Sequence, residues 1–149
     1  MKHTIVDKAR MLRGVPLLSE VSTEVLAELA ALATIEDHPM SKVLFVEGDP
    51  ADAFYVLIDG AVLAGRRGVE VFQASPGEEF GALAVLDERP RAFTATTTKP
   101  SKVMRIGAED FLYLLEQHPR LARGVIRHLA REVRSSIAGK GRYSTTTAE

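Results

Sequence analysis

The sequence predicts a mainly β domain of the jelly-roll or sandwich kind, with helices before and after the β region. Short runs rich in Val, Ile, Phe and Thr fill residues 34–106. Turn signals such as "EGDPAD", "IDG", "RRG" and "SPGEE" separate these runs about every 8–12 residues, the spacing of an all-β fold. Apolar residues recur at helical spacing on both sides of this region. The chain has 149 residues, a length that suits a single domain.

Two helices are expected before the β region, over residues 4–13 and 22–33. The second begins after Ser22, which is a favourable N-cap because its hydroxyl can accept a backbone N–H of the first turn. Its apolar residues recur at the spacing of one helical face; they are Val25, Leu26, Leu29 and Leu32.

Two more helices are expected after the β region. Residues 108–118 carry acids in the first turn and stop before Pro119, and residues 120–138 follow as a longer helix. We expect one domain over residues 1–137 and a disordered polar tail over 138–149. The longer helix has an apolar stripe of Ala122, Val125, Ile126, Leu129 and Val133, and its arginines are expected to form a solvated face.

The composition argues against several classes of function. The formal net charge is −1, so we expect no nucleic-acid binding by this chain alone. It contains no cysteine, and its four histidines are scattered without metal-ligand spacing, so neither a metal site nor catalytic residues are expected. No apolar run is long enough for a membrane segment or a signal peptide. We therefore expect a cytoplasmic location.

One segment, "EEFGALAVLDERPRAFTATTT" at residues 78–98, places a lone arginine after a glycine turn and a short apolar run. Together with "FVEGDPADAFYVLIDGAV", which supplies Gly48, Asp49 and Gly60, it resembles the cyclic-nucleotide-binding domain family. The resemblance covers about residues 15–135. The later segment matches the family's phosphate-binding cassette, a Phe-Gly-Glu-Leu-Ala-Leu-Leu pattern followed by a spacer and Pro-Arg.

The resemblance implies the family's double-stranded β-helix fold, a ligand rather than a cofactor, and a set of ligand-binding residues. Arg91 would hold the cyclic phosphate, because a guanidinium fork suits phosphate oxygens. The turn at 81–86 would present backbone N–H groups to the same anion. The implied binding residues are Phe80, Gly81, Ala82, Leu83, Ala84, Arg91, Ala92 and Phe93, and Arg123 or Arg127 of the last helix would touch the base.

Three positions affect which nucleotide would bind, how tightly it would bind and whether the pocket is open. Ala92 follows the arginine, and a small residue there favours cAMP over cGMP. Ala82 stands where the family has a glutamate that accepts the ribose 2′-hydroxyl, a loss expected to weaken binding about ten- to a hundredfold. Phe93 replaces a small residue, and it obstructs the ligand if it points into the pocket but only packs if it points into the core. If no ligand binds, Glu79 or Glu88 is expected to pair with Arg91.

The sequence favours a regulatory sensor without catalysis of its own, which binds a cyclic nucleotide or another small anion. Movement of the last helices would pass the signal to an attached or separate effector protein. One alternative is a degenerate module that no longer binds nucleotide and acts in protein interaction. Another is the sensor half of a regulator similar to the catabolite-activator family, lacking its DNA-binding domain here. The apolar stripe on the last helix is a candidate surface for a homodimer.

Overall fold

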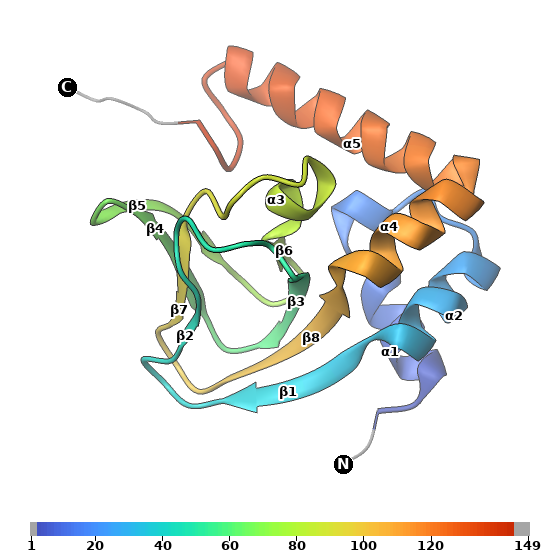
Figure 1. Cartoon of the computed structure of the whole chain (residues 1–149), viewed down its shortest axis with the longest axis horizontal. Coiled ribbons are helices and arrows are strands. Elements are labelled where there is room, and N and C mark those ends of the chain that lie inside the picture. Colours follow the sequence, from blue (N-terminus) through green and yellow to red (C-terminus); the bar gives the residue numbers. More distant parts are fainter. Residues whose placement is uncertain (1–2, 145–149) are drawn as a thin grey trace.

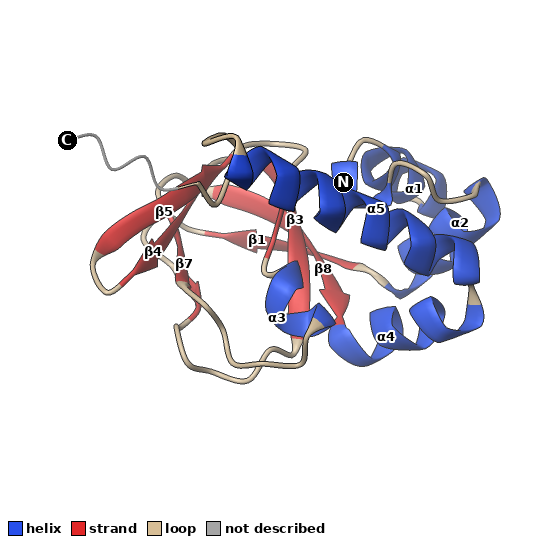
Figure 2. Cartoon of the chain, turned by 90° about the horizontal axis from the view of Figure 1, so that it is seen from above, coloured by secondary structure: helices blue, strands red, loops and turns tan. Residues whose placement is uncertain are grey.

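A computed structural model describes residues 3–144, and its β region forms two antiparallel sheets with most of the helices gathered at one end (Figures 1 and 2). The predicted mainly β class with flanking helices is confirmed. The first sheet has the order β1-β8-β3-β6 and the second the order β2-β7-β4-β5. The strands are β1 (Thr34–His38), β2 (Val43–Phe45), β3 (Ala53–Asp59), β4 (Val62–Arg66), β5 (Val69–Ala74), β6 (Glu79–Phe80), β7 (Thr94–Thr97) and β8 (Ser101–Gly107).

The helices begin where the sequence supplies caps. Thr4 and Asp7 form a reciprocal capping box at the first helix, and the Ser22 hydroxyl accepts the Val25 N–H at 3.3 Å at the second. A 3₁₀ turn between them was not predicted. The helical elements are α1 (Ile5–Arg13), η1 (Pro16–Leu18), α2 (Thr23–Leu32), α3 (Ala82–Leu86), α4 (Ala108–Gln117) and α5 (Pro119–Ile137).

Strand β3 of the first sheet is buried on both faces for most of its length, because helices cover one side and the second sheet covers the other. Along β3, Phe54 and Val56 belong to the core shared with the helices. The alternate residues Tyr55 and Leu57 belong to the core between the sheets. This arrangement explains why β3 is a continuous apolar run rather than an alternating one.

The buried face of α5 matches the predicted stripe only in part, at Val125 and Leu129. Leu121, Gly124 and Val125 are buried, whereas Ile126 is 64% exposed and Val133 is 60% exposed. The helix packs against η1 and the residues that follow it. A Cβ placed on Gly124 would lie 3.4 Å from the Glu20 Cβ, so this small residue sets the close approach.

Residues 138–144, expected to be disordered, occupy defined positions beyond α5 and turn back toward the roll in Figure 1. Gly139 and Gly141 have φ values of +75° and +89°, which let the chain reverse directly after the helix. The Lys140 N–H donates to the Ser135 carbonyl at 2.7 Å and fixes this reversal. The rest of the predicted tail lies outside the described residues. Within the described part of the chain, no helix is long and apolar enough to cross a membrane.

Candidate functional site: the cassette and its arginine

The cassette, residues 80–93, runs from the end of β6 through α3 to the start of β7. Gly81 is the N-cap of α3 with a φ of +89°, a left-handed conformation that glycine adopts without strain. The predicted binding residues around it point in different directions. Phe80 is buried between the two sheets, and Ala82 is buried against the helical core. Leu83 is half-buried, and Ala84 is buried on the side that faces α4.

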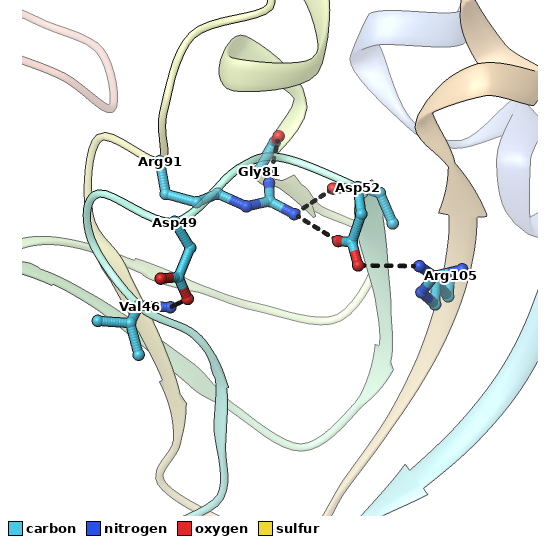
Figure 3. A network of polar contacts seen from close by, with 7 residues as sticks. Val46, Asp49, Asp52, Gly81, Arg91 and Arg105 are labelled. Atoms are coloured by element: carbon cyan, nitrogen blue, oxygen red, sulfur yellow. Dashed lines mark hydrogen bonds and ion pairs between the residues drawn. The ribbon is translucent and has the colours of Figure 1, made fainter.

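The backbone of Arg91 is fixed to the glycine turn that precedes β3. The Arg91 N–H donates to the Asp49 carbonyl at 2.8 Å, and the Gly48 N–H donates to the Arg91 carbonyl at 2.9 Å. The Asp49 carboxylate accepts the Val46 N–H at 3.3 Å within the same turn (Figure 3). The two segments that carried the family resemblance therefore lie side by side, and one positions the other.

The Arg91 side chain points into the protein, and only 1% of it is exposed. Nη1 donates to the Gly81 carbonyl at 2.9 Å and Nη2 donates to the Ala53 carbonyl at 2.5 Å (Figure 3). The guanidinium carbon lies 3.9 Å from the centroid of the Phe45 ring, within the range of a cation–π contact. Nε is buried and has no hydrogen-bond partner in the described structure. The guanidinium is thus held in place through its two terminal nitrogens, while its Nε is left without a partner.

Asp52, rather than Glu79 or Glu88, is the acid that pairs with Arg91. Its carboxylate lies 3.4 Å from Nη2 of Arg91 and 3.4 Å from Nη2 of Arg105, so it bridges the two cations (Figure 3). The Asp52 side chain is 74% exposed, and solvent therefore screens this pairing. Burial lowers the pKa of Arg91, and the nearby Tyr55 and Asp52 oppose that shift.

A pocket of about 310 Å³, here called the cassette pocket, adjoins the exposed side of the cassette. Ala92 and Phe93 line it together with Leu83. Phe93 is 4% exposed and packs in the inter-sheet core, with its ring centroid 5.6 Å from that of Phe45. The aromatic ring therefore packs in the core and also forms the inner wall of the pocket. The remaining lining residues include Val69 and Val71 of β5 and Tyr143.

Arg123 and Arg127 lie elsewhere. They line a separate hollow with Glu20, and no cassette residue borders that hollow. The Arg127 Nη1 is 2.9 Å from the Glu20 carboxylate, and Arg131 pairs with the second oxygen of the same carboxylate at 3.1 Å. Part of the arginine face of α5 thus anchors the helix to the segment after η1. In this structure neither Arg123 nor Arg127 reaches the cassette.

Three residues near the site were missed by sequence reasoning. Asp52 lies far from Arg91 in sequence, and only the charge inside "GDPAD" before an apolar strand hinted at it. Arg142 and Tyr143 were assigned to the tail because their segment lacks apolar periodicity. Among residues 3–144, no group of three His, Cys, Asp or Glu side chains is placed to hold a metal ion.

Comparisons with known proteins identify the family of this chain. The profile of the family described as "Cyclic nucleotide-binding domain" matches residues 35–118. A cAMP-dependent protein kinase regulatory subunit of Aspergillus niger is 38% identical over 106 residues, which cover 70% of this chain and 26% of the relative. The chain therefore spans about a quarter of that relative's length.

Two solved structures are similar over most of the chain. The N-terminal domain of a transcriptional regulator from Streptomyces coelicolor has a TM-score of 0.73 and 31% identity, over 86% of this chain and 93% of that one. The regulatory domain of Toxoplasma gondii PKA, crystallised with cAMP, has a TM-score of 0.71 and 25% identity, over 76% and 46%. With the family profile covering more than half of its residues, the chain belongs to the cyclic nucleotide-binding domain family.

Proposed function

We propose that this domain is a regulatory sensor whose cassette holds the phosphate of a cyclic nucleotide through Arg91 and the 81–86 turn. The observation that carries the proposal is the state of the Arg91 guanidinium. It is buried, its Nε lacks a partner, and the acid beside it is mostly exposed. A buried cation that is only partly compensated favours an anion within reach.

We propose cAMP as the preferred nucleotide and cGMP as the weaker ligand. Ala92 offers no side-chain hydroxyl beside the cassette pocket. Two of the similar proteins support cAMP by their names, a cAMP-dependent kinase regulatory subunit and a regulatory domain crystallised with cAMP. We do not propose a catalytic role for this domain.

The signal would leave the domain through α4 and α5. Ala84 of α3 and Leu112 of α4 line the same hollow, and α3 contacts α4 directly, so a shift of the cassette would be transmitted to α4. We propose that an attached or separate effector protein responds to the position of these helices. This chain spans about a quarter of the kinase regulatory subunit it resembles, so the effector is proposed and not taken over from that relative.

Two further functions have observations in their favour. A degenerate module that acts in protein interaction is favoured by Ala82, which supplies no ribose contact, and by the Phe93 ring in the pocket wall. The sensor part of a transcription regulator is favoured by the Streptomyces coelicolor domain, of which this chain covers 93%.

Calorimetric titration with cAMP and with cGMP distinguishes the nucleotide sensor from the degenerate interaction module. We expect micromolar or tighter binding of cAMP and weaker binding of cGMP. If the folded protein releases no heat with either nucleotide, and neither nucleotide raises its melting temperature, the sensor proposal fails. The favoured function is then a degenerate module that acts in protein interaction.

We also propose that α5 pairs with a second copy of the chain. Ile126, Val133 and Ile137 lie at helical spacing on one face, and each is at least 60% exposed. A carboxylate at the centre of this face should prevent pairing because it would be buried without a partner. We expect Val133→Glu to shift a dimer to a monomer in analytical ultracentrifugation, whereas Arg134→Glu, at a neighbouring exposed position, should leave it unchanged. Identical monomeric profiles for the native chain and both variants would contradict pairing.

A further inference from the structure

The chain does not leave the domain at the end of α5. Residues 139–144, here called the strap, reverse direction and lie against the β-roll (Figure 1). The reversal is built from two left-handed glycines, and within it the Ser144 N–H donates to the Gly141 carbonyl at 3.3 Å. The strap is therefore a folded segment of the domain that ends beside the cassette.

Arg142 anchors the strap to the strand that leads into the cassette. Its Nη1 lies 3.2 Å from the Glu79 carboxylate and its Nη2 lies 3.7 Å from that of Glu78. The guanidinium carbon is also 4.1 Å from the centroid of the Phe72 ring. The Arg142 side chain is 16% exposed and that of Glu79 is 12% exposed, so this pair is shielded far better than a surface ion pair.

Tyr143 places its ring in the wall of the cassette pocket. It meets the Phe72 ring edge to face, with centroids 5.7 Å apart. It lines the same space as Leu83, Ala92 and Phe93, which are cassette residues. One side of the pocket is therefore built from a segment with its own anchor, and the other sides are built from the roll.

We propose that the strap is a built-in cover for the cassette pocket, latched by Arg142 on Glu79, and that its release opens the pocket to a ligand. The latch sits on β6, whose last residue directly precedes Gly81 of the cassette. A movement of the strap would therefore act on the start of the cassette, and a movement of the cassette would act on the latch. That the ligand is a cyclic nucleotide rests on the proposed function; that the strap covers the pocket does not.

The cover can be tested without nucleotide, because the chain contains no cysteine. Val71 lines the cassette pocket and is half-buried, so Val71→Cys gives a single thiol that reports access to the pocket. We expect Arg142→Ala in this background to raise the thiol-labelling rate about five- to thirtyfold, as loss of an ion pair and a cation–π contact would allow. Lys140→Ala removes the same charge from an exposed strap residue that makes no ion pair within residues 3–144, and it should not change the rate.

Equal labelling rates with and without Arg142 would overturn the cover, provided that circular dichroism shows both proteins folded. A parallel cAMP titration separates this proposal from the proposed function. Faster labelling together with tighter cAMP binding supports both. Faster labelling with no nucleotide binding in either protein supports the cover and rejects the nucleotide sensor.

Alkaline titration tests the strap in a second way. Burial raises the pKa of Tyr143 to about 12, and Glu79 adds to that shift while Arg142 opposes it. Because the pKa in the closed state lies above the ordinary 10.0, the strap keeps its full stability below about pH 10 and loses it as the pH rises through about 12. The charged groups that face this ring or its pocket are Glu79, Glu132, Arg142, Arg66 and Glu70.

We expect the near-ultraviolet absorbance of ionised tyrosine to show a step near pH 12 that Tyr143→Phe removes. The chain has three tyrosines, so the lost step should account for about a third of the total change. The matched control is Tyr113→Phe, which alters a tyrosine that is 59% exposed on α4 and should leave that step in place. Burial also raises the pKa of Tyr55, so the test is the amplitude that the substitution removes. A step near pH 12 with the same amplitude in Tyr143→Phe as in the native chain would contradict a buried position for this ring.

Discussion

Replacing Arg91 with alanine is expected to weaken cAMP binding about a hundredfold or more, because at least two charge-assisted hydrogen bonds to the phosphate would be lost. The same change removes the donors that satisfy the buried carbonyls of Gly81 and Ala53. We therefore also expect the free energy of unfolding to fall by roughly 2 to 4 kcal/mol. Calorimetry and denaturant unfolding measure the two effects separately.

Two variants make this result interpretable. Arg89→Ala removes the same charge from an exposed residue two positions earlier, so it should leave both binding and stability nearly unchanged. Arg91→Lys keeps the charge but replaces the planar fork with a point charge, and it should recover part of the stability and little of the affinity. If Arg91→Ala binds cAMP as tightly as the native chain, Arg91 does not hold the phosphate.

Replacing Gly81 with alanine is expected to damage the same site through the backbone. The φ of +89° at this residue costs a side-chain-bearing residue about 1–2 kcal/mol. The added methyl group would also lie 2.8 Å from Nη1 of Arg91 and 3.2 Å from the Phe45 ring. Because this guanidinium is buried and hydrogen-bonded, it can yield only by giving up those bonds. We expect cAMP affinity to fall about tenfold or more, since one charge-assisted hydrogen bond is worth about that much.

Gly77 offers a matched control for that experiment. Its φ is +91°, and a methyl group added there would meet nothing within 4 Å. Gly77→Ala should therefore show the backbone cost alone, without a change in affinity. The difference in unfolding free energy between the two variants measures the close contacts with Arg91 and the Phe45 ring. Equal losses of stability, with affinity intact in both, would show that the close approach at Gly81 does not position the arginine.

Local signals in the sequence were enough to predict most of the fold. Ser22 and the apolar residues after it predicted α2 within one residue at each end, because capping and helical periodicity are properties of neighbouring residues. The β region was predicted from its turns and composition, and the structure begins β1 at Thr34 as expected. The pairing of β3 with β8 could not be derived in this way, since it joins residues far apart in the chain.

The parts of the site that escaped prediction depend on long-range contacts. Asp52 reaches Arg91 only because the turn before β3 packs against the cassette. On α5 the predicted stripe was right for Val125, but it also placed Ile126 and Val133 on the buried face, whereas packing against η1 buries Leu121 and Gly124 and leaves those two exposed. The strap has no periodicity to detect, and its position depends on the Glu79 carboxylate, which lies 63 residues before Arg142.

The most direct test of the central claim is the 1H–15N resonance of the Arg91 Nε–H group, followed while cAMP is added to the isotopically labelled protein. The resonance is assigned by its disappearance in Arg91→Lys, and Arg89→Lys identifies a neighbouring arginine as a control. Since this Nε has no partner in the described structure, we expect its signal to shift strongly as a phosphate oxygen becomes its acceptor, while that of Arg89 stays in place. Saturable cAMP binding that leaves the Arg91 signal unmoved would contradict the assignment of this arginine as the phosphate ligand.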